Sequence, residues 1–319
     1  MTERLMARFR RFAEQEARGH SPLYEAITLG VAGDPRIVEI LSRLPEAKQQ
    51  PNLLLGAFRM VCGTPADWPD FRTRFMARTA DIVSEMNARQ TQTNEPGRCA
   101  VLLPLLARLH QPLALVEVGA SAGLCLLPDR YAYTFNGKLL GRAGATPVFA
   151  CKANAATPVP AQLPEIAWRA GLDLNPVNPR DPSQLSWLEA LVWPDQPDRL
   201  DRLRAAVAVA RNNPVRVMQG DLLTNLPAVL DQAPRGPTVA VFHSATLAYV
   251  RDPAQRTEFA RTVFDAGAVW ISHEVPGTFP DIAERVAKGG PPGAFLLSVN
   301  GQPVAWTDPH GAWIEWLAP

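Results

Sequence analysis

The stretch VEVGASAGL (116–124) spaces small residues in a way that fits two chemistries. The segment GASAG fits GxSxG, the pattern of a strained strand-to-helix turn that would present Ser121 as a nucleophile. Counted from Glu117, the stretch also fits ExGxSxG, in which Gly119, Ser121 and Gly123 form a small-residue loop that lets a cofactor approach a strand and a helix N-terminus. Ser121 is therefore either a nucleophile or one wall of a cofactor site.

Polar residues follow two later apolar segments that have the character of strands. GLDLNP places Asp173 and Asn175 after the second such segment, and QGD places Asp221 after the third. In an open parallel sheet the ligand binds outside the carboxyl ends of the strands, where the strand order reverses. Asp173 could there accept both hydroxyls of a ribose, and Asp221 could meet an adenine edge.

Histidines and a glutamate end the fourth and fifth segments of this kind. His243, His273 and Glu274 are suited to removing a proton near neutral pH. The alternative is that each histidine is structural and bonds to a neighbouring loop. Tyr131 and Tyr249 could line an acceptor pocket, although aromatic residues near a hairpin also pack. The residues that could bind a metal lack HExxH spacing, so no metal is expected.

The polar stretch QTQTNEPG (90–97) precedes an apolar helical segment. Gln92, Asn94 and Glu95 could cover the cofactor pocket and orient an acceptor. The alternative is that Asn94 or Thr93 caps the helix that follows.

The elements that would position these residues change character near residue 113. The first 112 residues are predicted to be helical, with Ser21-Pro22, Asp34-Pro35 and Thr64-Pro65 as helix starts. Buried parallel strands separated by helices then follow. The five strands are predicted at about 113–119, 166–176, 215–221, 238–244 and 268–274.

Two further segments depart from this rhythm of strand and helix. A β-rich insertion at about 128–164 contains an Asn136-Gly137 turn, which is a strong hairpin signal. Asn300-Gly301 and a second turn at 308–311 predict a final antiparallel hairpin. The fold class is therefore α/β with a mostly parallel sheet, a helical N-terminal cap (1–112) and a Rossmann-like domain (113–319).

The chain order favours the cofactor interpretation of Ser121. A nucleophile turn follows several strands of its sheet, whereas only helices are predicted before Ser121. A triad would need an acid and then a histidine downstream, and Asp308 and His310 lie only two residues apart. Asp252 or Asp281 could serve as the acid instead, so the hydrolase stays an alternative.

The set EVGASAG, GLDLNP and QGD with a final hairpin resembles the class I S-adenosylmethionine-dependent methyltransferases. The resemblance covers 113 to the C-terminus and implies methyl transfer to oxygen or nitrogen of a small-molecule acceptor. It also implies that Glu117, the 119–123 loop, Asp173, Asn175 and Asp221 hold the cofactor. A serine hydrolase using Ser121 and a non-catalytic methyltransferase-like binding protein are the alternatives.

Three departures from the methyltransferase pattern stand out. A serine replaces the middle glycine, the first helix is short, and about 45 residues separate the loop from the second strand. QTNEPGRC, VEVGASAGL, AGLDLNP, VWPDQ and VFHSATLAYV more closely resemble a bacterial family of unknown function, DUF2332. That resemblance spans nearly the whole chain and implies no activity.

The amino-acid composition limits the kinds of molecule that the protein is expected to bind. The 319 residues carry 32 Lys and Arg against 31 Asp and Glu, a net charge of +1, so no global field favours nucleic acid or an anionic membrane. The four cysteines form no CxxC pair, and the N-terminus has no continuous apolar core like that of a signal peptide. We expect a cytoplasmic protein with a small-molecule partner.

Overall fold

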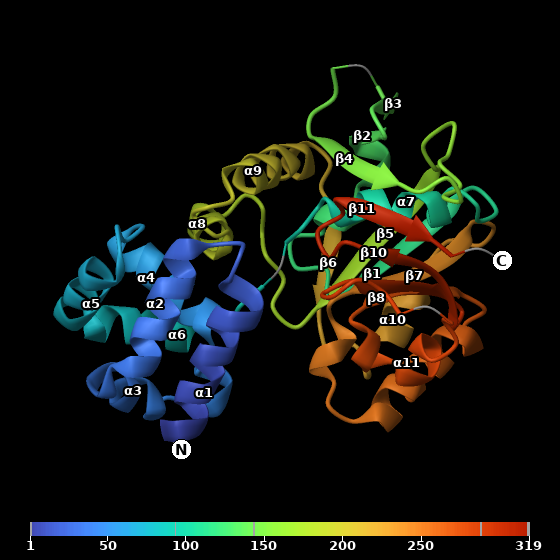
Figure 1. Cartoon of the computed structure of the whole chain (residues 1–319). Helices are drawn as coiled ribbons and strands as arrows, with labels where there is room; N and C mark the ends of the chain where they lie inside the picture. Colours follow the sequence, from blue (N-terminus) through green and yellow to red (C-terminus); the bar gives the residue numbers. More distant parts are fainter. Residues whose placement is uncertain (1, 93, 143, 288, 318–319) are drawn as a thin grey trace. The chain divides into compact units, whose positions relative to one another are not determined.

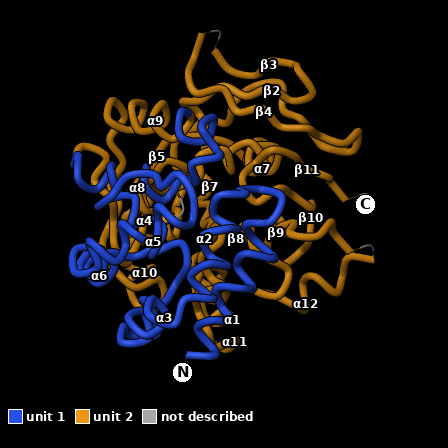
Figure 2. Tube along the Cα trace, turned by 60° about the vertical axis from the view of Figure 1, so that its left-hand side comes forward, with its two compact units in different colours: residues 1–93, 181–201 blue, residues 94–180, 202–319 orange. Residues whose placement is uncertain are grey.

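The computed structural model describes residues 2–92, 94–142, 144–287 and 289–317. The chain folds as two compact units, each built from two separate stretches (Figure 2). The first unit comprises 1–93 and 181–201, and the second comprises 94–180 and 202–319. The predicted domain boundary at residue 112 differs from this division, because 94–112 belong to the second unit.

The first unit is helical throughout its described residues, as predicted for the N-terminal region (Figure 1). Its elements are α1 (Thr2–Phe12), the π-helical turn η1 (Ala13–Ala17), α2 (Pro22–Gly33), α3 (Pro35–Ser42), the 3-10 turn η2 (Glu46–Lys48), α4 (Pro51–Cys62), α5 (Trp68–Ala77), α6 (Thr79–Ala88) and α8 (Pro182–Leu191). Helix α9 (Pro197–Asn212) begins in the first unit and ends in the second.

Two of the three predicted helix starts are confirmed. The Ser21 side chain accepts a hydrogen bond from the Tyr24 backbone N–H at the start of α2. Asp34 accepts hydrogen bonds from the N–H groups of Arg36 and Ile37 at the start of α3. The prediction at Thr64-Pro65 was wrong, because α5 begins later and is capped by Asp67. An acidic side chain satisfies the exposed N–H groups as well as the predicted threonine would.

Helix α8 joins the first unit through close packing on α4. Trp187 is buried in the same core as the apolar residues of α1–α6. A Cβ added to Gly56 of α4 would lie 2.9 Å from a methyl group of Leu191, so the glycine lets α8 approach closely. The core also contains a stack in which Phe58 and Phe71 have ring centroids 4.3 Å apart.

The second unit is built on one eleven-stranded sheet. In spatial order the strands are β3 (Lys138–Leu140), β2 (Ala132–Phe135), β4 (Val148–Ala153), β11 (Trp313–Trp316), β10 (Gln302–Thr307), β9 (Phe295–Val299), β8 (Val269–Glu274), β7 (Thr238–Ser244), β1 (Leu113–Val118), β5 (Ile166–Asp173) and β6 (Arg216–Gln219). All five predicted parallel strands are present, in the order β6-β5-β1-β7-β8. The mixed α/β class with a mostly parallel sheet is therefore confirmed.

The strand order reverses at β1, which lies between β5 and β7. The chain goes from β1 outward to β5 and β6 on one side, and then returns to β7 and β8 on the other. This makes β1/β7 the switch point of a doubly wound sheet, the position near which sheets of this kind bind their ligands.

The insertion and the final hairpin extend the same sheet. The predicted turns are confirmed, because Asn136 and Asn300 have φ of 49° and the following glycines are also left-handed. Strands β9, β10 and β11 pair antiparallel. Strand β4 of the insertion pairs parallel with both β2 and β11, so the insertion forms the edge of the sheet.

Short helices complete the second unit: α7 (Arg98–Leu106), η3 (Leu124–Leu126), η4 (Pro128–Arg130), α10 (Leu226–Leu230), η5 (Leu247–Tyr249), α11 (Pro253–Asp265), η6 (Pro276–Thr278) and α12 (Pro280–Ala283). Every residue of α7 is buried, which is why it belongs to this unit and not to the predicted cap.

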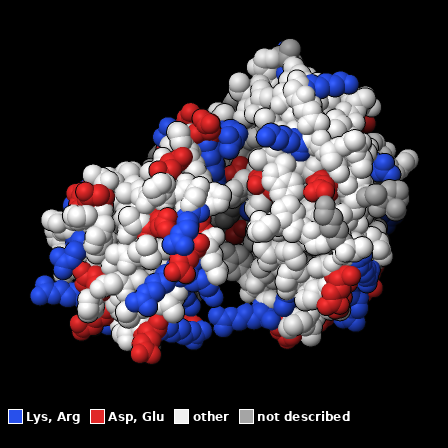
Figure 3. Space-filling view, viewed as in Figure 1, with Lys and Arg blue, Asp and Glu red and all other residues white. Residues whose placement is uncertain are grey.

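Charged side chains of both signs are intermixed on the face of each unit shown in Figure 3. In the described part of the chain, no helix is long and apolar enough to cross a membrane.

Candidate functional site

The loop after β1 lies at the switch point and has an unusual backbone. Gly119, Ser121 and Gly123 have φ of 76°, 48° and 68°, so every second residue is left-handed. Neighbouring side chains also require the glycines, because a Cβ at Gly119 would overlap the hydroxyl of Thr246. At Gly123 it would lie 3.2 Å from Val217. A left-handed non-glycine residue costs roughly 1–2 kcal/mol, so Ser121 needs compensating contacts.

These contacts reach every polar atom of Ser121. Its N–H donates to Asp173 Oδ2 at 2.8 Å, and its carbonyl accepts from the Val177 N–H at 3.1 Å. The Asn94 side chain donates to Ser121 Oγ at 2.8 Å and accepts from the Ala122 N–H at 3.0 Å. Asp173, predicted to bind a ribose, therefore lies directly against the loop that was predicted to approach the cofactor.

Asn94 is thus a partner of the loop and not a helix cap. Helix α7 begins at Arg98, and its N-cap position is Gly97, which has no side-chain cap. The alternative interpretation of Asn94 as a cap was wrong, because its carboxamide is used by Ser121 and Ala122. Thr93, the other proposed cap, lies outside the described residues.

Glu117 lies buried on β1 beside this loop. Burial, with the nearby Cys125 and Asp173, raises its pKa well above the ordinary value, while Arg98 opposes the shift. Its Oε2 is buried and accepts no hydrogen bond from the described residues. A buried carboxyl group with an oxygen that accepts no hydrogen bond is stable if it is protonated, or if a positively charged group binds beside it.

The histidines at the ends of β7 and β8 are fully buried, so neither is exposed to a substrate. Trp270 Nε1 donates to His243 Nε2 at 3.0 Å, which leaves Nδ1 as the nitrogen that donates to Glu274 Oε1 at 2.7 Å. Glu274 Oε1 also accepts the N–H groups of Thr246 and Leu247. Burial alone would raise the pKa of Glu274, but these hydrogen bonds, that from His243 first, lower it.

His273 is engaged in the same way. Its Nδ1 lies 2.5 Å from Ser244 Oγ and its Nε2 lies 2.7 Å from Thr307 Oγ1. Burial, followed by Arg98 and the two neighbouring histidines, lowers its pKa well below the ordinary value. His243 contacts Glu274, whereas His273 contacts Ser244 and Thr307, because neighbouring residues of β8 point to opposite faces of the sheet. The interpretation of His243 and His273 as substrate-facing bases must therefore be corrected. Both histidines are 0% exposed and their ring nitrogens are occupied.

The remaining predicted residues separate into several environments. Tyr131 is 1% exposed and its hydroxyl donates to the Leu124 carbonyl, so it supports the loop from within the core and does not line an open pocket. Tyr249 is 75% exposed. Asp221 accepts from the N–H groups of Leu223 and Thr224 and caps a turn.

Three other predicted residues flank the loop or lie elsewhere in the chain. The Asn175 N–H donates to Asp173 Oδ1 at 2.7 Å. The buried Glu95 accepts from the Gly97 N–H through its carboxylate. Gln92 belongs to the first unit, whereas the 119–123 loop belongs to the second.

Arg98 is a central residue that was not predicted. Its guanidinium is buried and donates from Nε to the Pro309 carbonyl at 2.9 Å and from Nη1 to the Ser244 carbonyl at 3.1 Å. It therefore ties α7 to the end of β7 and to the 308–311 turn. The signal in the sequence is a single charged residue at the start of the otherwise apolar helix RCAVLLPLL.

Comparisons with known proteins identify the family. No curated protein matches this chain. A solved structure described as a possible exported protein from Bordetella parapertussis aligns with 88% of this chain and 73% of its own, at 14% identity and a TM-score of 0.31. The model of DUF2332, described as an uncharacterized protein conserved in bacteria, matches residues 6–316. The chain therefore belongs to the DUF2332 family.

Proposed function

We propose that the second unit binds S-adenosylmethionine at the carboxyl ends of β1 and β5 and transfers its methyl group to oxygen or nitrogen of a small molecule. The observation that carries the proposal is the hydrogen bond of 2.8 Å between the Ser121 N–H and Asp173. It joins a loop with left-handed glycines to the carboxylate at the end of β5, the strand beside β1. This is where such sheets hold the ribose of a nucleotide cofactor.

The side chains fit part of this cofactor. Asp173 is only half-buried, and a carboxylate has about four acceptor positions, so two backbone hydrogen bonds leave room for ribose hydroxyls. Glu117 Oε2, buried and without a hydrogen bond from the described residues, fits a cofactor that carries positive charge. The glycines themselves are explained by packing against Thr246 and Val217, so they give weaker support than the two carboxyl groups.

Each residue then has a definite task. The bound cofactor would supply an electrophilic methyl group. Asp173 would hold the ribose, Glu117 would balance positive charge, and Asn94 would keep the loop in position through Ser121. The protein's contribution is mainly orientation, which can supply much of the acceleration of a group transfer. Proton removal is not assigned to His243 or His273, because both rings are buried and engaged.

Isothermal titration with S-adenosylmethionine and S-adenosylhomocysteine tests this assignment. Asp173→Ala should weaken both by about tenfold or more, because hydrogen bonds to a charged group are lost. Asp265→Ala, at the exposed end of α11, is the matched control and should bind normally. Chemical unfolding of each variant separates loss of binding from loss of the fold. No binding at millimolar concentration, or unchanged binding by Asp173→Ala, contradicts the proposal.

Turnover is a separate question from binding. Transfer of labelled methyl groups to a small-molecule fraction of a cell extract should follow from the wild-type protein and not from Asp173→Ala. Cofactor binding without such transfer would favour the alternative of a non-catalytic binding protein.

The left-handed serine favours a second candidate, a serine hydrolase. Ser121 has φ of 48° within GxSxG, and a nucleophile turn also strains its serine. The segment after it is only the short turn η3, and Ser121 Oγ accepts a hydrogen bond from Asn94. Labelling by a fluorophosphonate that disappears in Ser121→Ala would support the hydrolase, and absence of labelling would remove it.

A further inference from the structure

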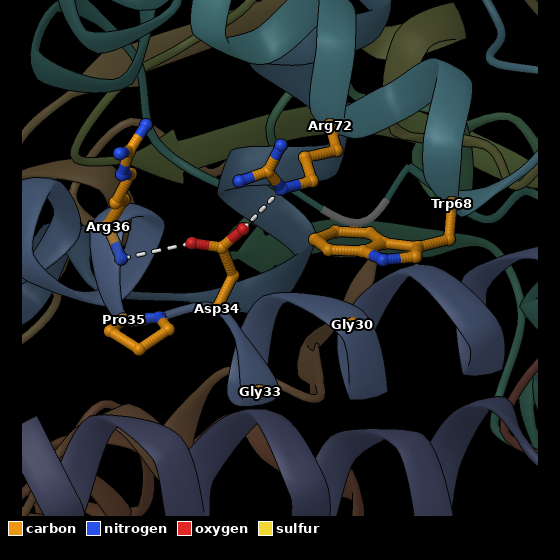
Figure 4. Close-up of a pocket in the computed structure, with 7 residues that line it drawn as sticks. All are labelled: Gly30, Gly33, Asp34, Pro35, Arg36, Trp68 and Arg72. Carbon is orange, nitrogen blue, oxygen red and sulfur yellow. Dashed lines mark hydrogen bonds and ion pairs between the residues drawn. The ribbon is translucent and has the colours of Figure 1, made fainter.

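The first unit contains a cavity of about 520 Å³, apart from the residues considered above. It is lined by α2, the start of α3 and α5, through Gly30, Gly33, Asp34, Pro35, Arg36, Trp68 and Arg72 (Figure 4). Cavities of this size hold small organic molecules. The lining combines one indole, two guanidinium groups and one carboxylate.

The single carboxylate of the cavity accepts hydrogen bonds on both oxygens. Asp34 Oδ1 accepts the N–H groups of Arg36 and Ile37 at 2.9 and 3.3 Å, and Oδ2 accepts Arg72 Nε at 2.6 Å. Burial would raise the pKa of Asp34, but the hydrogen bonds from Arg72 and from the two N–H groups lower it. Asp34 therefore stays ionised near neutral pH, and it compensates one of the two arginines.

The donors of the cavity exceed its acceptors. Arg72 uses only Nε on Asp34, and its two terminal nitrogens donate to no other residue in the described ranges. The Arg36 guanidinium likewise makes no ion pair or hydrogen bond with a described side chain. In Figure 4 the Arg36 and Arg72 side chains flank the Asp34 carboxylate, one to its left and one to its right. A cavity with a charge of +1 and unused guanidinium donors favours a ligand rich in acceptors and negative charge.

Trp68 supplies an apolar surface in the same cavity. A Cβ at Gly30 would overlap its six-membered ring, so the glycine allows the indole to lie directly on α2. Phe71 stacks near the indole, with ring centroids 5.9 Å apart, and helps to hold its orientation. The ring is only partly buried, which leaves surface for a planar ligand group. Figure 4 shows it on the Arg72 side of Asp34.

We infer that this cavity binds a small organic anion, with its carboxylate or phosphate on Arg36 and Arg72 and its planar body against Trp68. The site lies wholly within the first unit and does not depend on cofactor binding by the second. An aryl phosphate and an aryl carboxylate share the chemistry that the cavity recognises.

Isothermal titration of the full chain with phenyl phosphate, benzoate, inorganic phosphate and benzyl alcohol tests the inference. Phenyl phosphate or benzoate should bind more tightly than inorganic phosphate, which lacks the ring, and than benzyl alcohol, which lacks the charge. Whichever aryl anion binds more tightly identifies the preferred head group. Arg36→Gln should weaken binding by about tenfold or more. Trp68→Leu should remove the preference for the aryl anion over inorganic phosphate.

Arg36→Gln is the decisive variant, because the Arg36 side chain has no described structural partner and the substitution leaves the Asp34–Arg72 ion pair intact. Arg10→Gln, on the exposed face of α1, makes the same charge change in the same unit and should bind like the wild type. No binding of either aryl anion at millimolar concentration, or equal affinity in Arg36→Gln and Arg10→Gln, overturns the inference. Neither result affects the titration of Asp173→Ala with S-adenosylmethionine.

Discussion

The strand-end network of the second unit (His243, His273, Glu274 and their partners) and the cavity of the first unit both contain ionisable side chains, but these differ in how far they are paired. In the network, His243 and His273 are buried with bonded ring nitrogens, and Glu274 is bonded through Oε1. Glu274 Oε2, like Glu117 Oε2, is buried without a hydrogen bond from the described residues. In the cavity, Arg36 and Arg72 keep donors that the described chain does not use. Polar side chains that are already paired inside a protein stabilise it, whereas partly exposed donors without partners are available to a ligand.

The comparison predicts that substitutions in the network change stability and that substitutions in the cavity change binding. The 119–123 loop and its neighbours combine paired polar groups, as in the network, with unpaired ones, as in the cavity. Ser121 is paired at each polar atom, yet the neighbouring Asp173 is half-buried and Glu117 retains an unpartnered oxygen.

Glu274→Ala should have the largest effect. The substitution removes the acceptor for His243 Nδ1 and for the N–H groups of Thr246 and Leu247, which leaves buried donors unpaired. We expect the free energy of unfolding in urea to fall by about 3–5 kcal/mol. Glu258→Ala breaks only an exposed pair with Arg261 and should change it little. A loss below about 1 kcal/mol for Glu274→Ala would show that the network is not structural.

His273 should make stability depend on pH. Because burial holds its pKa well below 6.5 in the folded state, the unfolded chain binds the proton first. The stability that neutral His273 contributes is therefore present above about pH 6.5 and is lost as the pH falls below that value, by up to about 1.4 kcal/mol per pH unit. Urea unfolding across this range should show a shallower decline for His273→Gln than for the wild type.

One control variant and one opposing contribution determine how this measurement is interpreted. His20→Gln, at an exposed position, should retain the wild-type slope. The contribution of Glu117 to stability has the opposite pH dependence. Its pKa is raised in the folded state, so its stabilisation is lost as the pH rises above about 4.5. The pH profile of wild-type stability is the sum of these contributions. The difference between the profiles of His273→Gln and the wild type therefore isolates the contribution of His273. Equal slopes for His273→Gln and the wild type would contradict the burial argument.

Asp34→Asn should strengthen anion binding in the cavity. Asparagine still caps α3, but the charge of the cavity rises from +1 to +2. We expect the affinity for phenyl phosphate to rise roughly threefold to tenfold, given screening near the surface. Asp70→Asn breaks a similar pair with Arg74 that does not line the cavity, and should leave affinity unchanged. Weaker binding by Asp34→Asn would mean that Asp34 is needed chiefly to position Arg72.

The sequence predicted the order of elements better than their packing partners. Strand β1 and its four parallel partners were predictable because buried parallel strands are short apolar runs. The unit to which α7 belongs was not, since a helix that is apolar on every side can be buried against either unit. Nor does the apolar pattern around α8 say that Trp187 packs with helices that precede it by more than a hundred residues.

The sequence placed the candidate residues at strand ends but did not indicate their hydrogen-bond partners. Residues at strand ends could be placed on one rim, where His243 contacts Glu274 and His273 contacts Ser244. Their partners could not be foreseen, because Thr307 reaches His273 only through the pairing of β8 with β9 and of β9 with β10. Asn94 matched a cap signature equally well, and only the fold shows that its carboxamide lies on the 119–123 loop.

Ser121→Gly is the smallest and most discriminating change. Glycine removes a left-handed strain of roughly 1–2 kcal/mol, while loss of the hydroxyl forfeits about 1 kcal/mol from the hydrogen bond with Asn94. The two terms nearly cancel, so unfolding in urea should shift by less than about 1 kcal/mol and binding of S-adenosylmethionine should persist. Ser121→Ala keeps the strain and loses the same bond, so it should be the less stable variant. If Ser121→Gly proved the less stable of the two, the strain argument would be contradicted. If Ser121→Gly lost much more than about 1 kcal/mol relative to the wild type, the hydroxyl would matter more than the backbone, and Ser121 would be a residue whose hydroxyl the loop holds for function.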